Sequence, residues 1–337
     1  MKLLRKEAAF VLVLAALFGI LAYTGIALTR GNERIAMLWL PNAVAAAWLI
    51  YSRTRAAPFY ILGCLLANIA VNRLVGDNWS IALGLAIANS VEIATLVLLV
   101  RKAKNVALDL AEVDTYAVLI LASVVASFAS AIVASVVLAD TGTGFSLADG
   151  QRWLIADALS LIIILPVTLV FLGAWRERKS PQARDLLEWM VMVGLVTIGT
   201  MLIFTQTTFP FLFLTSPLVL YAAFRPGLVG TAVATLLITA ISSAATAIGL
   251  GPIILVRGGS ELQLVAYQAF LATNFAIGFP VAALLAQRNR DRLRFRLERD
   301  EKQEVLDNIR DVIFRADANG CWSSLNPAWE TLTGYKI

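Results

Sequence analysis

Two acidic side chains, Glu92 and Asp157, lie inside long apolar stretches of this sequence. A carboxylate surrounded by hydrocarbon is energetically unfavourable, so it indicates a functional site by default. Neither stretch contains a lysine or an arginine. Three explanations stay open: the acids face water, one of them is protonated because burial disfavours its charge, or a ligand or a proton relay completes the site.

Other polar and aromatic residues are predicted at a similar depth in the membrane. With the N-terminus in the cytoplasm, Asp157 lies about one turn below the outer surface and Glu92 lies near mid-depth. Trp39 and Trp153 fall at the outer interface, where tryptophan commonly anchors helices. Five amide side chains fall in the outer halves of their helices: Asn42, Asn68, Asn72, Asn89 and Gln206.

This distribution predicts a polar cavity that opens to the outside and binds a small ligand. The expected ligand-binding residues are Trp39, Asn42, Asn89, Glu92, Trp153 and Asp157. The alternative is that these side chains hydrogen-bond between helices and only hold the bundle together, as asparagine and glutamine often do in membranes.

Composition defines the elements that must position these residues. The chain is 59% hydrophobic and 15% charged, with a mean hydropathy of +0.77, which is typical of a polytopic membrane protein. We expect an all-α membrane bundle of ten spans, most near the roughly 20 residues that cross a bilayer. Eight is the alternative, because Pro210 and Pro217 could break one helix as readily as separate two. The expected spans are approximately 8–28, 35–51, 57–75, 80–100, 116–138, 153–173, 187–205, 210–224, 228–249 and 262–286.

The distribution of basic residues orients the bundle. Up to Lys302, this topology places twenty Lys and Arg residues inside and five outside, which agrees with the positive-inside rule. We therefore expect a multi-pass membrane protein with both termini in the cytoplasm. The net charge of +5 comes from these cytoplasmic loops, which attract anionic lipid headgroups. The bilayer is therefore an expected partner and nucleic acid is not.

Several kinds of chemistry have no matching residues. The sequence has no histidine, which excludes imidazole metal ligands and histidine acid–base or phosphotransfer chemistry over these residues. Cys64 and Cys321 fall in environments that cannot meet, so we expect no disulfide. We predict no catalytic residue, no metal site and no cofactor here. The repeated Ser123, Ser127 and Ser130 are interpreted as a helix-packing face.

The sequence changes character after Leu285. An arginine-dense segment without Gly or Pro predicts a helix that continues out of the last span. On either side of a polar gap, apolar residues at spacings of four, four and three give a weak coiled-coil pattern: Leu293 and Leu297 before the gap, then Val305, Ile309 and Val312.

A hairpin and a helix are predicted next. Two strand-like runs, 312–317 and 321–325, flank Asn319-Gly320, and this pair favours a tight turn. Asn326 is expected to cap the following helix, with Pro327 at its first position.

The order D-x-x-G, N-P-A, T-G-Y over residues 317–335 resembles the start of a PAS domain. Because the sequence given stops at Ile337, before most of a PAS sheet, we expect a truncated domain and a longer protein, and no PAS ligand is assigned.

Four pieces of the apolar region recur together in order and spacing: Trp39-Leu-Pro41, Trp153-Leu-Ile-Ala-Asp157-Ala-Leu with Pro166, Pro217 to Gly230, and Thr246 to Pro252. With them the region, over roughly residues 8–290, resembles the membrane-associated sensor family, MASE type one. Asn42 and Ser160 stand where this family more often has Ala or Gly. The resemblance implies an input module of the bacterial inner membrane, placed ahead of cyclic-di-GMP synthases and hydrolases or of sensor histidine kinases.

We therefore expect three regions: a membrane sensor domain over 1–286, a basic signalling helix over 287–307 and the beginning of an α/β PAS domain over 308–337. The leading hypothesis is the input domain of a bacterial signal-transduction protein with a cyclic-di-GMP output, a small-molecule ligand and a homodimeric state. A histidine kinase output is the alternative. A secondary transporter or a passive membrane anchor is the alternative of another class, although no clear inverted repeat supports transport.

Overall fold

The computed structural model describes residues 2–29, 39–104, 108–139, 146–177, 183–319 and 321–336. The chain divides into two compact units, Met1–Leu285 and Ala286–Ile337. The long helix α10 (Ser260–Asn308) contributes to both of them.

The first unit is helical, which confirms the expected all-α membrane bundle. Each of the ten apolar stretches corresponds to one helix. Among the described residues, eight helices are long and apolar enough to cross a membrane, whereas α2 and α8 are shorter. Ten crossings therefore stay a prediction. The helices before α10 are α1 (Lys2–Thr29), α2 (Leu40–Ser52), α3 (Ala57–Leu74), α4 (Trp79–Ala103), α5 (Val113–Ala139), α6 (Leu147–Glu177), α7 (Ala183–Thr205), α8 (Thr215–Phe224) and α9 (Gly227–Ala247), with 3-10 helices η1 (Phe211–Leu214) and η2 (Pro252–Leu255).

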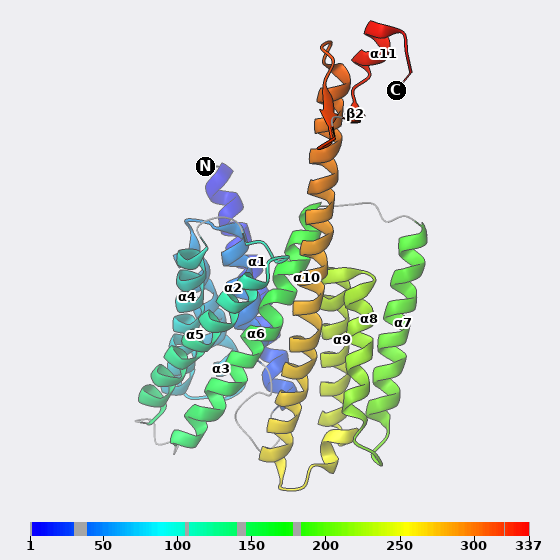
Figure 1. The fold of residues 1–337 in the computed structure, drawn as a ribbon. Helices are drawn as coiled ribbons and strands as arrows, with labels where there is room; N and C mark the ends of the chain where they lie inside the picture. The colour runs from blue at the N-terminus through cyan, green and yellow to red at the C-terminus, as the bar shows by residue number, and fades with distance from the viewer. Residues whose placement is uncertain are drawn as a thin grey trace. The chain divides into compact units, whose positions relative to one another are not determined.

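Helix α6 is the central element of this unit. Of its most apolar window, 67% is buried, compared with 22% in α1 and in α7. Helix α6 contacts α2 and α5 on one side and α9 on the other. Figure 1 shows α1 to α5 gathered on one side of α6, and α7 to α9 on the other. The unit therefore has two halves that meet at α6.

Helix α2 is short but deeply buried, and the local sequence sets both of its ends. Pro41 occupies the first turn, where its missing N–H would be unsatisfied in any case. Arg53 ends the helix in the left-handed conformation with a φ of 48°, and its N–H donates to the Leu49 carbonyl at 3.1 Å. A run of small residues, Ala43 to Ala47, lets α1, α4 and α6 approach closely. This packing places Asn42 in the interior of the bundle.

Side chains of the second half hold the part of α10 within the first unit at three places. Asn274 Oδ1 accepts a hydrogen bond from Thr215 Oγ1 of α8 at 2.9 Å, and the Tyr267 hydroxyl lies 3.1 Å from Ser242 Oγ of α9. At Gly278 the contact is tight, because an added Cβ would lie 2.3 Å from Val219 Cγ1. Helix α10 is therefore fitted closely against α8 and α9.

The second unit contains the end of α10, an antiparallel hairpin of β1 (Phe314–Ala316) and β2 (Trp322–Leu325), and α11 (Ala328–Thr333). The hairpin pairs Phe314 with Leu325, and the register shifts between Arg315 and Ala316. The predicted hairpin and helix are therefore confirmed as secondary structure. Gly320 of the predicted turn, like Arg30 and Arg34 of the predicted outer loop, lies outside the described residues.

Two details of the second unit differ from expectation. The residue before α11 is Pro327, and Asn326 does not cap this helix. Instead, its Nδ2 donates to carbonyls of Leu306 and Asp311, and its Oδ1 accepts from the Ile313 N–H at 2.9 Å. The Asn326 side chain therefore stabilises the turn between α10 and β1 instead of capping α11.

The proposed coiled-coil stripe is also interrupted. Helix α10 ends at Asn308, so Ile309 and Val312 of the expected stripe lie beyond the helix. Both cysteines, in contrast, are free as predicted, with Cys64 buried and Cys321 exposed.

Candidate functional site

Glu92 is the centre of a buried polar cluster in the first half of the bundle. It lies on α4 and is fully buried. Its Oε2 accepts a hydrogen bond from Asn42 Nδ2 of α2 at 2.5 Å, and its Oε1 accepts one from Ser127 Oγ of α5 at 2.6 Å. Hydrogen bonds to a carboxylate are shorter and stronger than neutral ones. Glu92 therefore links three helices.

Asn42 extends this cluster and also leaves one atom unused. Its Nδ2 donates a second hydrogen bond to Asn89 Oδ1, one turn before Glu92 on α4, at 2.9 Å. Its Oδ1 is buried without a hydrogen-bond partner. Since a buried polar atom normally has a partner, this free acceptor needs an explanation.

The position of Asn42 depends on how α2 begins. The backbone N–H of Trp39 donates to Ser160 Oγ of α6 at 2.7 Å, and this hydroxyl donates in turn to the Ala156 carbonyl at 2.7 Å. The start of α2 is thereby attached to α6, one turn before Asn42. The indole N–H of Trp39 has no partner.

Asp157 is the second carboxyl group of the cluster. It lies on α6 with 5% of its surface exposed, and it is close enough to Glu92 for the two carboxyl groups to repel each other when both are ionised. One turn earlier on α6, Trp153 Nε1 donates to Ser130 Oγ of α5 at 3.1 Å. Asp157 Oδ2 is buried and has no hydrogen-bond partner. We call Asn42, Asn89, Glu92, Ser127 and Asp157 the carboxyl cluster.

No basic side chain neutralises the carboxyl cluster among the residues that the structure describes. Arg101 follows Glu92 by nine residues, roughly 13 Å along α4 at 1.5 Å per residue. Its Nη2 donates to the Leu49 carbonyl at 2.6 Å. Burying an ion without a counter-charge has a desolvation free energy on the order of several kcal/mol. The charge of the carboxyl cluster must therefore be neutralised by a proton or by a bound cation.

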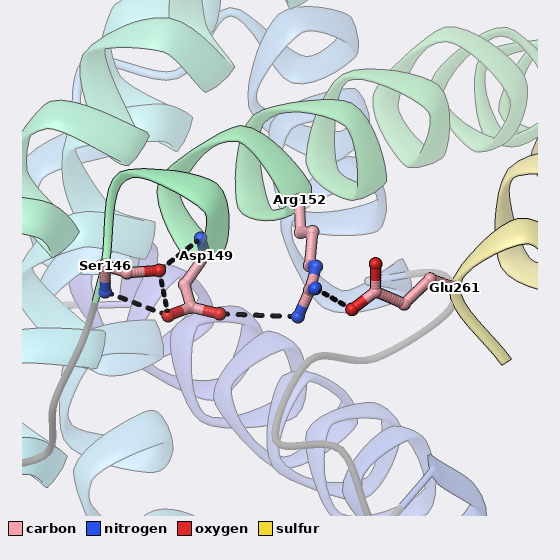
Figure 2. A network of polar contacts seen from close by, with 4 residues as sticks. All are labelled: Ser146, Asp149, Arg152 and Glu261. Atoms are coloured by element: carbon pink, nitrogen blue, oxygen red, sulfur yellow. Dashed lines mark hydrogen bonds and ion pairs between the residues drawn. The ribbon is translucent and has the colours of Figure 1, made fainter. Parts of the chain in front are cut away.

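The nearest arginine on α6 belongs to a separate network (Figure 2), in which Arg152 forms ion pairs with Asp149 and with Glu261 in the first turn of α10. Asp149 also accepts from the backbone N–H and the hydroxyl of Ser146, at 2.9 and 2.8 Å. This reciprocal pattern is a capping box at the start of α6. The Arg152–Glu261 pair joins the beginnings of α6 and α10.

The structure brings the six predicted site residues together to different degrees. Asn42, Asn89 and Glu92 are directly hydrogen-bonded, and Asp157 lies close to Glu92. Trp153 contacts Asp157 as well as a serine of α5, whereas Trp39 is attached through its backbone. The four polar side chains are closed off from the surface, with at most 5% of any of them exposed.

Sequence reasoning missed three hydroxyl groups. Ser127, Ser130 and Ser160 were interpreted as packing residues or as a departure from the family pattern, yet each accepts or donates a hydrogen bond at the site. The sequence did contain a signal for Ser160. Like the correctly predicted Asn42, it is polar where the resembled family more often has Ala or Gly.

Comparison with known proteins gives one match. The model of the MASE1 family matches residues 10–289, which is most of the chain. No curated protein and no solved structure matches.

Proposed function

The chain belongs to the MASE1 family of membrane-associated sensor domains, and we propose that it is the input domain of a bacterial signal-transduction protein. The carboxyl cluster detects the stimulus, and α10 transmits the response. The observation that carries this proposal is the uncompensated pair Glu92 and Asp157, since helix packing alone needs no buried charge.

The location of the cluster supports a role in switching. Its side chains come from α2, α4, α5 and α6, so a change in its charge or occupancy alters how four helices pack. A stimulus needs only to bind one packing state preferentially, and a difference of about a few kcal/mol shifts the population strongly.

Helix α6 offers a direct connection to α10. It carries Asp157 and, five residues earlier, Arg152, which pairs with Glu261 of α10. Helix α10 then runs without a break to Asn308. Movement of α6 relative to α2, α4 and α5 is therefore transmitted to α10, which carries the response toward the C-terminal residues.

The output is proposed from the residues after α10. The segment 308–337 resembles the start of a PAS domain, and we propose a cytoplasmic PAS domain followed by a cyclic-di-GMP synthase or hydrolase. A sensor histidine kinase is the second candidate, because the same arrangement precedes both. In this topology both termini lie in the cytoplasm, the cluster lies in the periplasmic half of the inner membrane, and two copies of the receptor act together.

The test uses the full-length receptor in cells. Asp157→Asn and Glu92→Gln are expected to abolish the response or fix it in one state, measured as cellular cyclic-di-GMP and, in parallel, as autophosphorylation. Membrane insertion is expected to stay normal. The matched control is Glu188→Gln, which removes a carboxylate from α7 outside the cluster. A normal response from both cluster variants would contradict the proposal.

A further inference from the structure

Three buried oxygen atoms, one on each of helices α2, α5 and α6, have no hydrogen-bond partner. They are Asn42 Oδ1, Ser123 Oγ and Asp157 Oδ2. Ser123 lies one turn before Ser127 on α5, so it shares the face that contacts Glu92. These atoms come from α2, α5 and α6; α2 and α5 pack against α4, and α6 packs against α2 and α5.

The chemistry of these atoms favours a cation. Carboxylate, amide and hydroxyl oxygens are the ligands that hard cations prefer. The two acids also have no ion-pair partner among the described residues, so a bound cation would supply the missing charge. A neutral hydrogen-bond donor would satisfy the free oxygens but would add no positive charge beside the acids.

The size and charge of the occupant can be narrowed further. Ala43, Ala46 and Ala88 next to the cluster are fully buried, as are Asn42 and Glu92, so the surroundings suit a bare ion better than an organic molecule. Both oxygens of Glu92 already accept hydrogen bonds. One carboxylate oxygen, Asp157 Oδ2, is then free alongside neutral oxygens, which suits one positive charge better than two.

We propose that the carboxyl cluster binds a small monovalent cation of the sodium type, coordinated by Asp157 Oδ2, Asn42 Oδ1 and Ser123 Oγ beside Glu92. The inference deepens the proposed function and rests on it for the claim that this binding is the stimulus. Binding itself can be measured without any output.

The experiment uses the full chain purified in lipid nanodiscs, with radioactive sodium as the probe. We expect saturable binding of one ion per chain. The midpoint of thermal unfolding is expected to rise with sodium concentration, because a ligand that binds only the folded state stabilises it. Choline chloride at equal ionic strength is expected to give no such rise, and potassium and lithium chloride report the preferred ionic size.

Substitution of the proposed coordinating residues tests where the ion binds. Asp157→Asn and Ser123→Ala are each expected to weaken sodium binding by at least about tenfold, and Glu188→Gln on α7 is expected to leave it unchanged. The comparison of sodium with choline on the unaltered chain needs no variant, so it decides the matter even if a variant fails to fold.

Three results would overturn the inference: no saturable binding of any alkali cation, stabilisation that follows pH but not the cation, or undiminished binding in both variants. In each case the proposed function survives if the cluster variants still lose the response in cells. Sodium binding together with a normal response in those variants would instead overturn the proposed function and leave the site in place.

Discussion

The two halves of the membrane unit bury polar groups in different ways. In α1 to α6, two carboxyl groups lie in the interior, and side-chain hydrogen bonds such as Asn42 to Glu92 cross between helices. In α7 to α9 the described buried polar side chains are the hydroxyls of Thr and Ser, for example Thr215 and Ser242, which bond neutral groups of α10. One half concentrates charge and the other holds α10.

The difference indicates a division of labour. A buried carboxyl without a counter-charge responds strongly to a proton or an ion, because a change of one charge in a poorly polarisable interior has a large energy. Neutral hydroxyls and small residues respond weakly but allow close helix contact. The first half is therefore suited to detection and the second half to positioning α10, with α6 between them.

Gly278→Leu is expected to have the largest effect on stability, because it acts on the closest contact of the second half. The added Cβ would overlap Val219 of α8, a side chain that is stiff because it is branched. Overpacking of this kind destabilises by about 1–3 kcal/mol and occasionally by more, and leucine adds three further carbon atoms beyond the overlapping Cβ. Denaturant unfolding in nanodiscs measures this loss in the free energy of unfolding. The control is Gly194→Ala on α7, where an added Cβ meets no atom within 4 Å. Equal stability of both variants would contradict the close contact between α10 and α8 at Gly278.

Removing one hydroxyl from each half compares their hydrogen bonds directly. Ser127→Ala leaves Glu92 Oε1 buried without its donor, and we expect a loss of about 1–3 kcal/mol. Ser242→Ala breaks a bond between two neutral hydroxyls, and we expect about 1 kcal/mol or less. Thermal unfolding of the two variants side by side checks this order. A larger loss for Ser242→Ala would contradict the description of the first half as the charged one.

Glu261→Gln is expected to have the smallest effect on stability. Its ion pair with Arg152 is exposed, and such pairs contribute about 0.2–1 kcal/mol. The response of the full-length receptor should nevertheless weaken, because the variant loosens α10 from α6. Spin-label distances between α6 and the first turn of α10 give an independent readout. An unchanged distance distribution with a normal response would show that the signal uses another route.

The helices were largely predictable because an apolar run of sufficient length is a local property of the sequence. The expected stretches 57–75 and 80–100, for instance, correspond to α3 (Ala57–Leu74) and α4 (Trp79–Ala103). The hairpin was predictable for a similar reason, since Asn-Gly between two strand-like runs determines its own turn.

The site was predictable in part. Glu92 and Asp157 stand out because charge is rare in apolar runs, whereas the contribution of Ser127 depends on which face of α5 meets α4. That choice is made by helix packing and leaves no local signal. The role of Asn326 was mispredicted for the same reason, because distant carbonyls compete with the local cap for its side chain.

The most direct test of the account measures stability and response on one variant, Asp157→Asn. Asp157 Oδ2 has no partner, so an amide removes a buried charge without breaking a hydrogen bond at that atom. In sodium-free buffer, the account predicts an unchanged or raised midpoint of thermal unfolding, and in cells it predicts a lost response, because Asp157 serves function at the expense of stability. A lowered midpoint with a normal response would contradict it and would make the carboxyl cluster a structural link between helices.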